Sequence, residues 1–432
     1  MISGKDHRVI TKKLANGAEG LLIDIPGATV MTFEFNFRAG YFLMEKDKWE
    51  TPHIMEHLSL GANSKFNKSR IFEAEFKKNG SYSNAYTNNY HVWYDAECAD
   101  FEWERILDLL TLSFSEPYFL KEEFIAESGN VRDELVGNMN SHGRTLSTAM
   151  YESLGMLSVP DAERIKLMQN VTLKDIIDHH KRTHTTSNMR FVMAGNLKGR
   201  MEHIEKVLSK IQLPKGRGLI ELPEETPSKL KRSIYIPRAS VKNVYFDLTT
   251  FSHKKFEDAD WDAASIANNI LTETLYSKIL GEARERGLAY GMGSGFGQYK
   301  SYVDWGIGGQ AQQENLPALL DIVVRELTKM KNGDVDDSDI ESAKQYALGR
   351  YQRGAQTVYG VMAGYSNRYF FEGKVNDYFG YPERLKKVKK NKVIEVMQAM
   401  FADNIWGLGI LGTADADLRK LAEQKVSALW QS

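Results

Sequence analysis

Residues 31–38 alternate between large apolar and polar side chains, in the order Met-Thr-Phe-Glu-Phe-Asn-Phe-Arg. A period of two is typical of a strand with one buried and one exposed face. The pattern therefore predicts a half-buried strand that ends at Ala39-Gly40. Residues 83–87 and 90–94, which are rich in aromatic and β-branched side chains, are interpreted as further strands.

Apolar residues at helical spacing predict helices over residues 102–112, 262–280 and 319–330. The second half faintly repeats the first, because in both a helix leads into an apolar strand that ends in glycine, at Gly195 and at Gly412. A duplicated domain is the simplest explanation. Residues 213–232, rich in proline and glycine, are the expected linker, so the predicted domains are 1–212 and 233–432.

Composition narrows the class of protein. The chain has 432 residues, 42% of them hydrophobic, and a net charge of −1, so no broad basic surface suggests nucleic-acid binding. No apolar stretch is long enough to predict a transmembrane helix, and the charged start shows no signal peptide. Cys98 is the only cysteine, which excludes an internal disulfide and fits a reducing compartment such as the cytoplasm.

The most informative motif is His53-Ile54-Met55-Glu56-His57. On a helix the two histidines lie on one face with the glutamate beside them, so both imidazoles can bind one metal ion. Zinc suits two histidines and one carboxylate, with a fourth position open to water. The spacing is that of the inverted zinc motif H-x-x-E-H. The alternative reading is an amphipathic helix with two solvated histidines.

A third ligand is available downstream. Glu127 and Glu134 are seven residues apart, which is two helical turns, so they share one helix face. The alternative is a charged, solvated helix face, which is what most acidic pairs form. Beside a histidine pair that lacks a third ligand, we favour a functional role.

Two other features are interpreted as structural. Alternate glycines at residues 291–297 imitate a phosphate loop, but no Lys-Ser/Thr pair follows, so a strand with close backbone approach is favoured. His180 and His184 have helical ligand spacing, but no carboxylate lies between them. We therefore interpret them as part of a solvated helix end.

With these motifs the chain resembles the pitrilysin-type (M16) metallopeptidase family, which includes insulin-degrading enzymes and the mitochondrial processing peptidase. The zinc motif and the downstream glutamate pair carry the resemblance, and in that family the second glutamate, here Glu134, is the third zinc ligand. Asn84-Ala85-Tyr86-Thr87 is similar to the family's N-A-x-T strand, which lies beside the bound peptide.

The segment 284–290, Arg-Glu-Arg-Gly-Leu-Ala-Tyr, resembles the family's R-x-x-R-G-L-A-Y segment, whose arginine and tyrosine hold the substrate near the metal. The family's pair is usually seven residues apart, whereas Arg284 and Tyr290 are six apart. Either the helix closes one residue early or Arg286 takes the role. We favour Arg284, although an arginine and a glycine at 286–287 also suit a plain helix end.

The resemblance implies an α+β fold with two related domains, each a mainly antiparallel sheet with helices on one face. Two such domains make half of a clamshell, as in the processing-peptidase subunits. A chain of this length would then need a partner, and we expect a homodimer, with a heterodimer as the alternative.

The resemblance also assigns roles. His53, His57 and Glu134 would hold one Zn²⁺ per chain, Glu56 would act as general base, and Glu127 would orient a ligand. Asn84 and Ala85 would bind a peptide backbone, and Tyr290 with Arg284 would donate hydrogen bonds to its carbonyls. The expected function is zinc-dependent cleavage of extended peptides. The alternatives are a catalytically weak or inactive partner subunit and a structural metal-binding protein.

Overall fold

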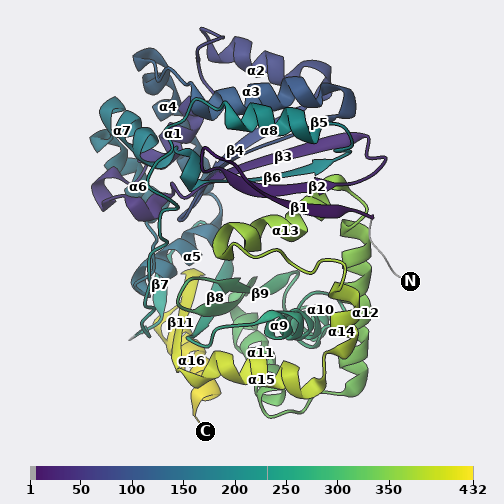
Figure 1. Ribbon diagram of the computed structural model, residues 1–432. Helices are drawn as coiled ribbons and strands as arrows, with labels where there is room; N and C mark the ends of the chain where they lie inside the picture. The colour runs from purple at the N-terminus through teal and green to yellow at the C-terminus, as the bar shows by residue number, and fades with distance from the viewer. Residues whose placement is uncertain (1–5, 231, 432) are drawn as a thin grey trace. The chain divides into compact units, whose positions relative to one another are not determined.

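The computed structural model describes residues 6–230 and 232–431, and in it the chain forms two compact α+β units (Figure 1). The first unit takes Ala162–Leu222, Tyr351–Phe379 and the described part of Met1–Val136. The second takes Gly137–Asp161, Pro223–Arg350 and the described part of Gly380–Ser432. Each unit therefore includes one segment from the opposite half of the sequence. The expected linker 213–232 contains no helix or strand in its described part, and Lys231 lies outside the described residues.

The first unit has a six-stranded sheet in the order β1-β2-β6-β3-β5-β4. Neighbouring strands are antiparallel except for β2 and β6, which are parallel. The strands are β1 (Arg8–Lys13), β2 (Glu19–Asp24), β3 (Val30–Phe37), β4 (Tyr82–Thr87), β5 (Val92–Ala99) and β6 (Met189–Gly195).

Helices that follow one another along the first half share a hydrophobic core with one face of this sheet. Side chains at helical spacing, such as Ile106 and Leu110 on α3, are fully buried there, as the periodicity predicts. The helices are α1 (Thr51–Ser59), α2 (Ser69–Lys77), α3 (Trp103–Ser115), α4 (Lys121–Asn138), α6 (Asp161–Leu167), α7 (Leu173–Thr183) and α8 (Met201–Ser209).

Strand β3 differs from its prediction, because it is buried on both faces. Its phenylalanines face the main core, but Glu34 and Asn36 on the opposite face are also buried. Helix α13 (Val358–Glu372) from the second half packs on that opposite face. Ser366 of α13 donates a hydrogen bond to Glu34, and Arg38 donates to the carbonyls of Phe370 and Phe371 at the end of the helix. A contact between residues so distant in sequence leaves no local pattern.

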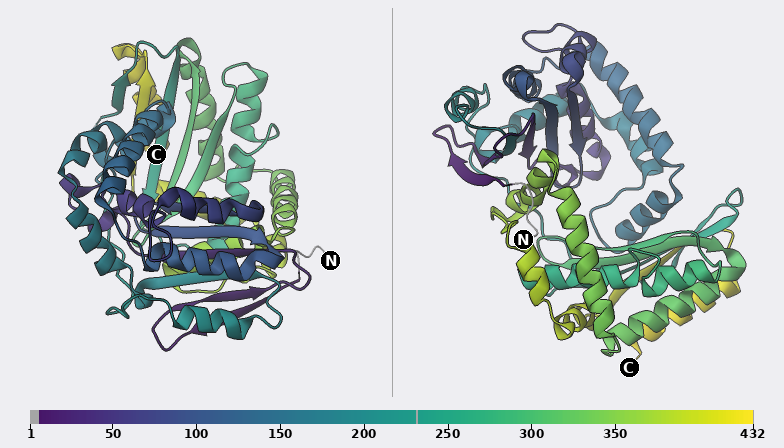
Figure 2. Two further views of the ribbon diagram at one scale, coloured as in Figure 1. Left: turned by 90° about the horizontal axis from the view of Figure 1, so that it is seen from above. Right: turned by 90° about the vertical axis from the view of Figure 1, so that its right-hand side faces the viewer.

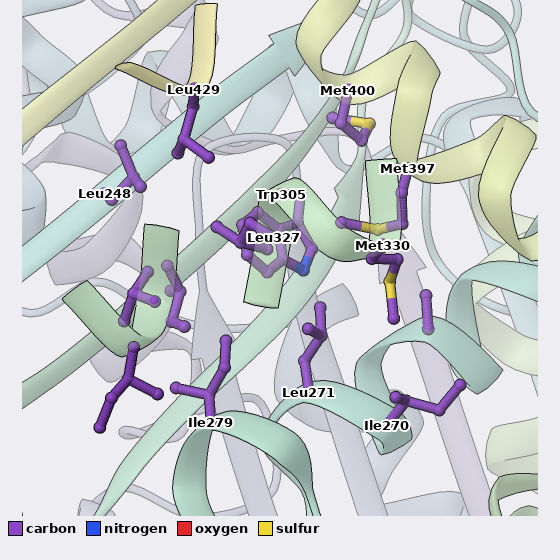
Figure 3. Packing of buried hydrophobic residues seen from close by; sticks show 14 of the residues in the cluster. Leu248, Ile270, Leu271, Ile279, Trp305, Leu327, Met330, Met397, Met400 and Leu429 are labelled. Carbon is purple, nitrogen blue, oxygen red and sulfur yellow. The ribbon is translucent and has the colours of Figure 1, made fainter. Parts of the chain in front are cut away.

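The second unit has a five-stranded sheet in the order β7-β11-β8-β10-β9, again with one parallel pair, β7 and β11. The strands are β7 (Ile234–Pro237), β8 (Asn243–Ser252), β9 (Met292–Gln298), β10 (Val303–Gln312) and β11 (Ile405–Gly412). Trp305 of β10 is fully buried at the centre of the core, against Leu327 and Met397 of the covering helices (Figure 3).

The helices of this unit lie on one face of the sheet, with one exception. They are α9 (Asp258–Leu271), α10 (Lys278–Glu285), α11 (Leu316–Lys331), α12 (Asp337–Gly354), α14 (Tyr381–Lys387), α15 (Lys390–Ala402) and α16 (Ala416–Ser427). The exception is α5 (His142–Ser153) from the first half, whose Leu146 and Met150 pack with Phe251 and Leu411. The ribbon of α5 lies on the other face of the sheet (Figure 2). Helices α5 and α13 thus play equivalent parts, each covering the sheet of the opposite half.

The predicted duplication extends to backbone detail. Gly195 ends β6 with φ +151°, and Gly412 ends β11 with φ +131°. A Cβ atom at Gly195 would lie 2.2 Å from the sulfur of Met31, and one at Gly412 would lie 2.7 Å from the carbonyl of Asn243. Both glycines are therefore required by a close approach and a backbone angle that other residues rarely adopt.

The single helix predicted over residues 262–280 is wrong, because the chain turns between α9 and α10. Ser277 accepts a hydrogen bond from the backbone N–H of Thr274 and donates one to the carbonyl of Asn269. Hydroxyl side chains compete in this way with helical hydrogen bonds, which explains the interruption. No helix in the described part of the chain is long and apolar enough to cross a lipid bilayer.

Candidate metal site

Helix α1 holds both histidines of the motif, as predicted. Pro52 lies in its first turn, where a missing N–H is harmless. The rings of His53 and His57 are one turn apart, with centroids separated by 5.0 Å. His53 is buried and His57 is partly exposed, so the pair lies where the helix face reaches the surface.

Helix α4 brings Glu134 to the same point. Its Oε2 lies 3.4 Å from Nε2 of His53 and 3.7 Å from Nε2 of His57. Ligand atoms about 2 Å from a tetrahedral zinc ion stand roughly 3.3 Å apart, so these separations fit one shared ion. Among the described residues, this is the only group of three or more His, Cys, Asp or Glu side chains that converges in this way.

The other nitrogen of each imidazole is held by a carboxylate. Glu127 of α4 lies 3.0 Å from Nδ1 of His57. Glu50 lies 3.1 Å from Nδ1 of His53. With both Nδ1 atoms occupied, both Nε2 atoms face Glu134, an arrangement that fixes tautomer and ring orientation in metal sites.

Glu50 was not identified from the sequence, and it belongs to a buried network. Its carboxylate accepts a hydrogen bond of 2.5 Å from Nε of Arg164 on α6. Arg164 also donates to the hydroxyl of Tyr41 at 2.6 Å. All three residues are buried. The position of Glu50 three residues before His53 was the available signal, but its partner Arg164 is 114 residues away.

Glu56 points into the site without completing the ligand set. It is only 6% exposed, and Thr87 of β4 donates a hydrogen bond of 2.9 Å to its Oε2. Burial raises the pKa of Glu56, although His53, His57 and Thr87 act in the opposite direction. A fixed carboxylate with a raised pKa has the properties of a general base.

The electrostatics of the site favour a positive charge. Burial alone would lower the pKa of His57, but Glu127 and Glu134 outweigh it and raise that pKa to about 10. Hydrogen bonds from the two histidines lower the pKa of Glu134 below its ordinary value. Because four carboxylates surround two imidazoles, a bound cation could replace the protons, and the donor set fits zinc.

The second unit has no such cluster among its described residues. Helix α12 follows the second sheet's edge hairpin as α4 follows that of the first, and both helices have 18 residues. Arg350 forms an ion pair with Glu273 at 2.9 Å.

The predicted peptide-binding residues lie on β4, which is an edge strand of the first sheet. Asn84 is exposed and Ala85 is buried. The other predicted pair lies in the second unit. Arg284 stacks over the ring of Tyr290, with 4.4 Å from Cζ to the ring centroid, and donates to its carbonyl at 2.5 Å.

The ambiguity over the arginine is reduced by this geometry. Helix α10 ends at Glu285, and Gly287 adopts φ +64°, so the helix closes early. Arg286 turns away to pair with Glu282 at 3.0 Å. Arg284 is therefore the arginine placed beside Tyr290, whose own side chain is 81% exposed.

The solvated helix end predicted around His180 and His184 is wrong, because His179, His180 and His184 are all buried. His184 lies 3.0 Å from the hydroxyl of Tyr94, which donates to Ser59 at 3.1 Å, and Ser59 donates to the carbonyl of Met55. These contacts attach α7 and β5 to the helix that carries the motif. Burial lowers the pKa of His180 to about 4, so it is neutral at physiological pH.

Comparison with known proteins gives two matching family models. Residues 34–155, which include His53, Glu56, His57, Glu127 and Glu134, match the model "Insulinase (Peptidase family M16)". Residues 170–346 match the model "Peptidase M16 inactive domain". The chain belongs to peptidase family M16. The M16 assignment covers both halves and agrees with the resemblance carried by the motifs.

Individual M16 relatives are distant. A Saccharomyces cerevisiae protein described as "Putative protease AXL1" is 28% identical over 166 residues, which is 37% of this chain and only 13% of that protein. A protease structure from Helicobacter pylori has a TM-score of 0.83 at 18% identity, covering 95% of this chain and 100% of that one. A chain of complex III from Candida albicans has a TM-score of 0.78 at 12% identity, and the match covers 96% of this chain and 100% of that one. At such identities the structures support the fold alone.

The buried network makes a test of Glu50 possible. Replacing Arg164 by Met leaves the buried Glu50 carboxylate with His53 as its remaining partner, so we expect the free energy of unfolding to fall by up to about 3–5 kcal/mol. The double variant Glu50→Leu/Arg164→Met removes both charges and should recover much of that loss. It still lacks the carboxylate on His53, so zinc affinity should stay about 10–100-fold below wild type.

Urea unfolding of metal-free protein measures the free energy of unfolding, and competition with a chromophoric chelator measures the zinc affinity. Glu163→Gln is the matched control, since it breaks only the exposed ion pair with Lys46 and should change neither by much. Wild-type zinc affinity in the double variant would show that Glu50 does not position His53.

Proposed function

We propose that this M16 chain is a zinc-dependent endopeptidase that cleaves extended peptides. Residues 1–212 would be the catalytic domain, and residues 233–432, after the linker 213–232, a related domain without a metal site. The observation that carries the proposal is the convergence of His53, His57 and Glu134, whose ligand atoms all lie within 4.8 Å of one another, beside the buried carboxylate of Glu56.

A zinc ion bound there would supply Lewis acidity, which acidifies water and polarises a peptide carbonyl. Glu56 would take the proton from the attacking water and pass it to the leaving amine. Thr87 holds Oε2 of Glu56 in place by its hydrogen bond. Glu50 and Glu127 would keep the two imidazoles turned toward Glu134.

Substrate binding would use the free edge of β4, where a peptide can add as a further strand beside Asn84 and Ala85. This mode explains why extended peptides are the expected substrates. Tyr290 would donate a hydrogen bond to a substrate carbonyl, and Arg284 would hold Tyr290 by stacking on its ring.

The second candidate is a catalytically weak or inactive partner subunit. It is supported by the match of residues 170–346 to the inactive-domain model and by the fold shared with a complex III chain. The complete ligand set and Glu56 favour the enzyme. Cleavage of a quenched peptide that is lost with chelator and restored by zinc would support the enzyme, and its absence would support the partner role.

The role of Glu56 is tested by an isosteric change. We expect Glu56→Gln to keep bound zinc and to lower turnover by about 10²–10⁴-fold, because the amide cannot accept the proton. Metal analysis and turnover of a quenched peptide are measured on the same preparation. Near-native turnover with zinc retained would contradict the assignment.

The two glutamates of α4 should differ in effect. We expect Glu134→Ala to abolish zinc binding, since it removes a ligand. Glu127→Ala removes only the contact with Nδ1 of His57 and should weaken binding by about 10–100-fold. Glu122→Ala, an exposed carboxylate in the first turn of the same helix, is the control. A larger loss for Glu127→Ala in zinc titration would reverse the two roles.

We further propose a homodimer in which Arg284 and Tyr290 of one chain serve the zinc site of the other, since a two-fold dimer is the commonest closed assembly. Mixing inactive Glu56→Gln and Tyr290→Phe proteins should then restore part of the activity, because a mixed dimer has one site with both lesions and one with neither. No recovery, in a mixture shown by mass spectrometry to have exchanged subunits, would exclude sharing between chains.

A further inference from the structure

The second unit contains a cavity of about 440 Å³ on the sheet face that α5 partly covers. Its floor is formed by β9 and β10, and one wall by Tyr151 of α5. Among its lining residues, all within the described chain, two are acidic and none is basic. None of them belongs to the candidate metal site.

The floor of the cavity is bare backbone. On β9, Met292 and Phe296 turn toward the core, so the residues that alternate with them face the cavity. The facing positions of the two strands are Gly293, Gly295 and Gly297 on β9 and Gly306 and Gly308 on β10, with Asp304 opposite Gly297. A Cβ atom at Gly293 or Gly295 would meet no other atom within 4 Å. The close backbone approach predicted for this strand is therefore absent at both positions.

Glycine weakens a strand, because it packs no side chain and loses more conformational freedom than other residues on folding. At Gly293 and Gly295 neither packing nor backbone angle requires it. The missing side chains leave a flat surface of peptide groups in the cavity. A flat group of a ligand could lie against this surface.

Two carboxylates border this floor. Asp304 is 4% exposed and accepts a hydrogen bond from the hydroxyl of Tyr151. Asp247 accepts one from Thr249 at 3.0 Å. Burial raises the pKa of each to about 6, and Asp304 adds to the effect on Asp247. Neither carboxylate has an ion-pair partner among the described residues, so the cavity is anionic at neutral pH and lacks a counter-charge.

We propose that this cavity binds the arginine side chain of a peptide, with the planar guanidinium group on the glycine floor beside Asp304 and Asp247. Arginine combines a flat, weakly hydrated cation with several N–H donors in one plane, which suits bare backbone bordered by carboxylates. A lysine ammonium is compact and strongly hydrated, and it would leave the floor uncovered. The inference rests on the proposed function only in taking the ligand to be a peptide.

Binding is measured on the Glu56→Gln protein by fluorescence anisotropy, so no turnover is needed. The labelled peptides are alike except for arginine, lysine or citrulline at one position. Citrulline keeps the shape of arginine and removes its charge. We expect the arginine peptide to bind about tenfold more tightly than either of the others, in line with a charge-assisted hydrogen bond.

Two added substitutions test the site itself. Asp247→Asn removes one charge, and Gly295→Val fills the floor without meeting another atom at its Cβ. Each should abolish the preference for arginine, and Asp247→Asn should leave the affinity for the citrulline peptide nearly unchanged. Glu314→Gln, at an exposed carboxylate, and Gly349→Ala, on α12, are the matched controls and should keep the preference. Thermal unfolding verifies that each variant is folded.

Equal affinity for the arginine and citrulline peptides, or an arginine preference that survives both substitutions, would overturn the inference. A lysine peptide that binds as tightly as the arginine peptide would also overturn it, and so would free arginine that competes as strongly as the peptide. Hydrolysis by the wild-type protein without arginine selectivity would contradict this inference alone. Arginine-selective binding without any hydrolysis would contradict the proposed function alone.

Discussion

The repulsion among four carboxylates around one pair of imidazoles determines the charge balance of the candidate metal site in the first unit. Glu50, Glu56, Glu127 and Glu134 approach the same helical turn, and Glu50 and Glu56 are buried there. Such a group is stable only if positive charge compensates it. The raised pKa of His57 shows one source of that charge, and a divalent cation would be a better one. Arg164 compensates the charge of Glu50. The other three carboxylates therefore determine the negative charge of the site.

The second half of the chain has the same order of strands and helices as the first, apart from β1, but the second unit lacks the cluster of metal ligands among its described residues. Helices α9 and α12 follow the strands of the second sheet in the order in which α1 and α4 follow those of the first, and Arg350 of α12 forms an ordinary ion pair with Glu273, just after α9. A partly exposed pair of this kind contributes little free energy and needs no ion. The second unit therefore keeps the duplicated fold without a comparable cluster among its described residues.

The sequence predicted features that depend on local spacing. The positions of His53 and His57 on one helix, and of Glu127 and Glu134 on another, follow from helical geometry alone. Features that depend on distant partners were missed. The role of Glu50 is apparent only from its contact with Arg164. The burial of Glu34 depends on α13, whose Ser366 is 332 residues further along the chain. His184 was misread because its partner Tyr94 lies on a different element.

The edge strands β4 and β9 occupy the same place in the two strand orders but carry different side chains. In the first, β4 carries tyrosines and the hydroxyl of Thr87 that holds Glu56. In the second, β9 carries glycines at the positions that face the cavity. The cores of both units keep the same strand order and one parallel pair each. Because an edge strand has a neighbour on one side only, its side chains can change with less disturbance to the core than those of a central strand. New chemistry in a duplicated fold is therefore expected at this edge, and both the proposed catalytic site and the proposed arginine site include it.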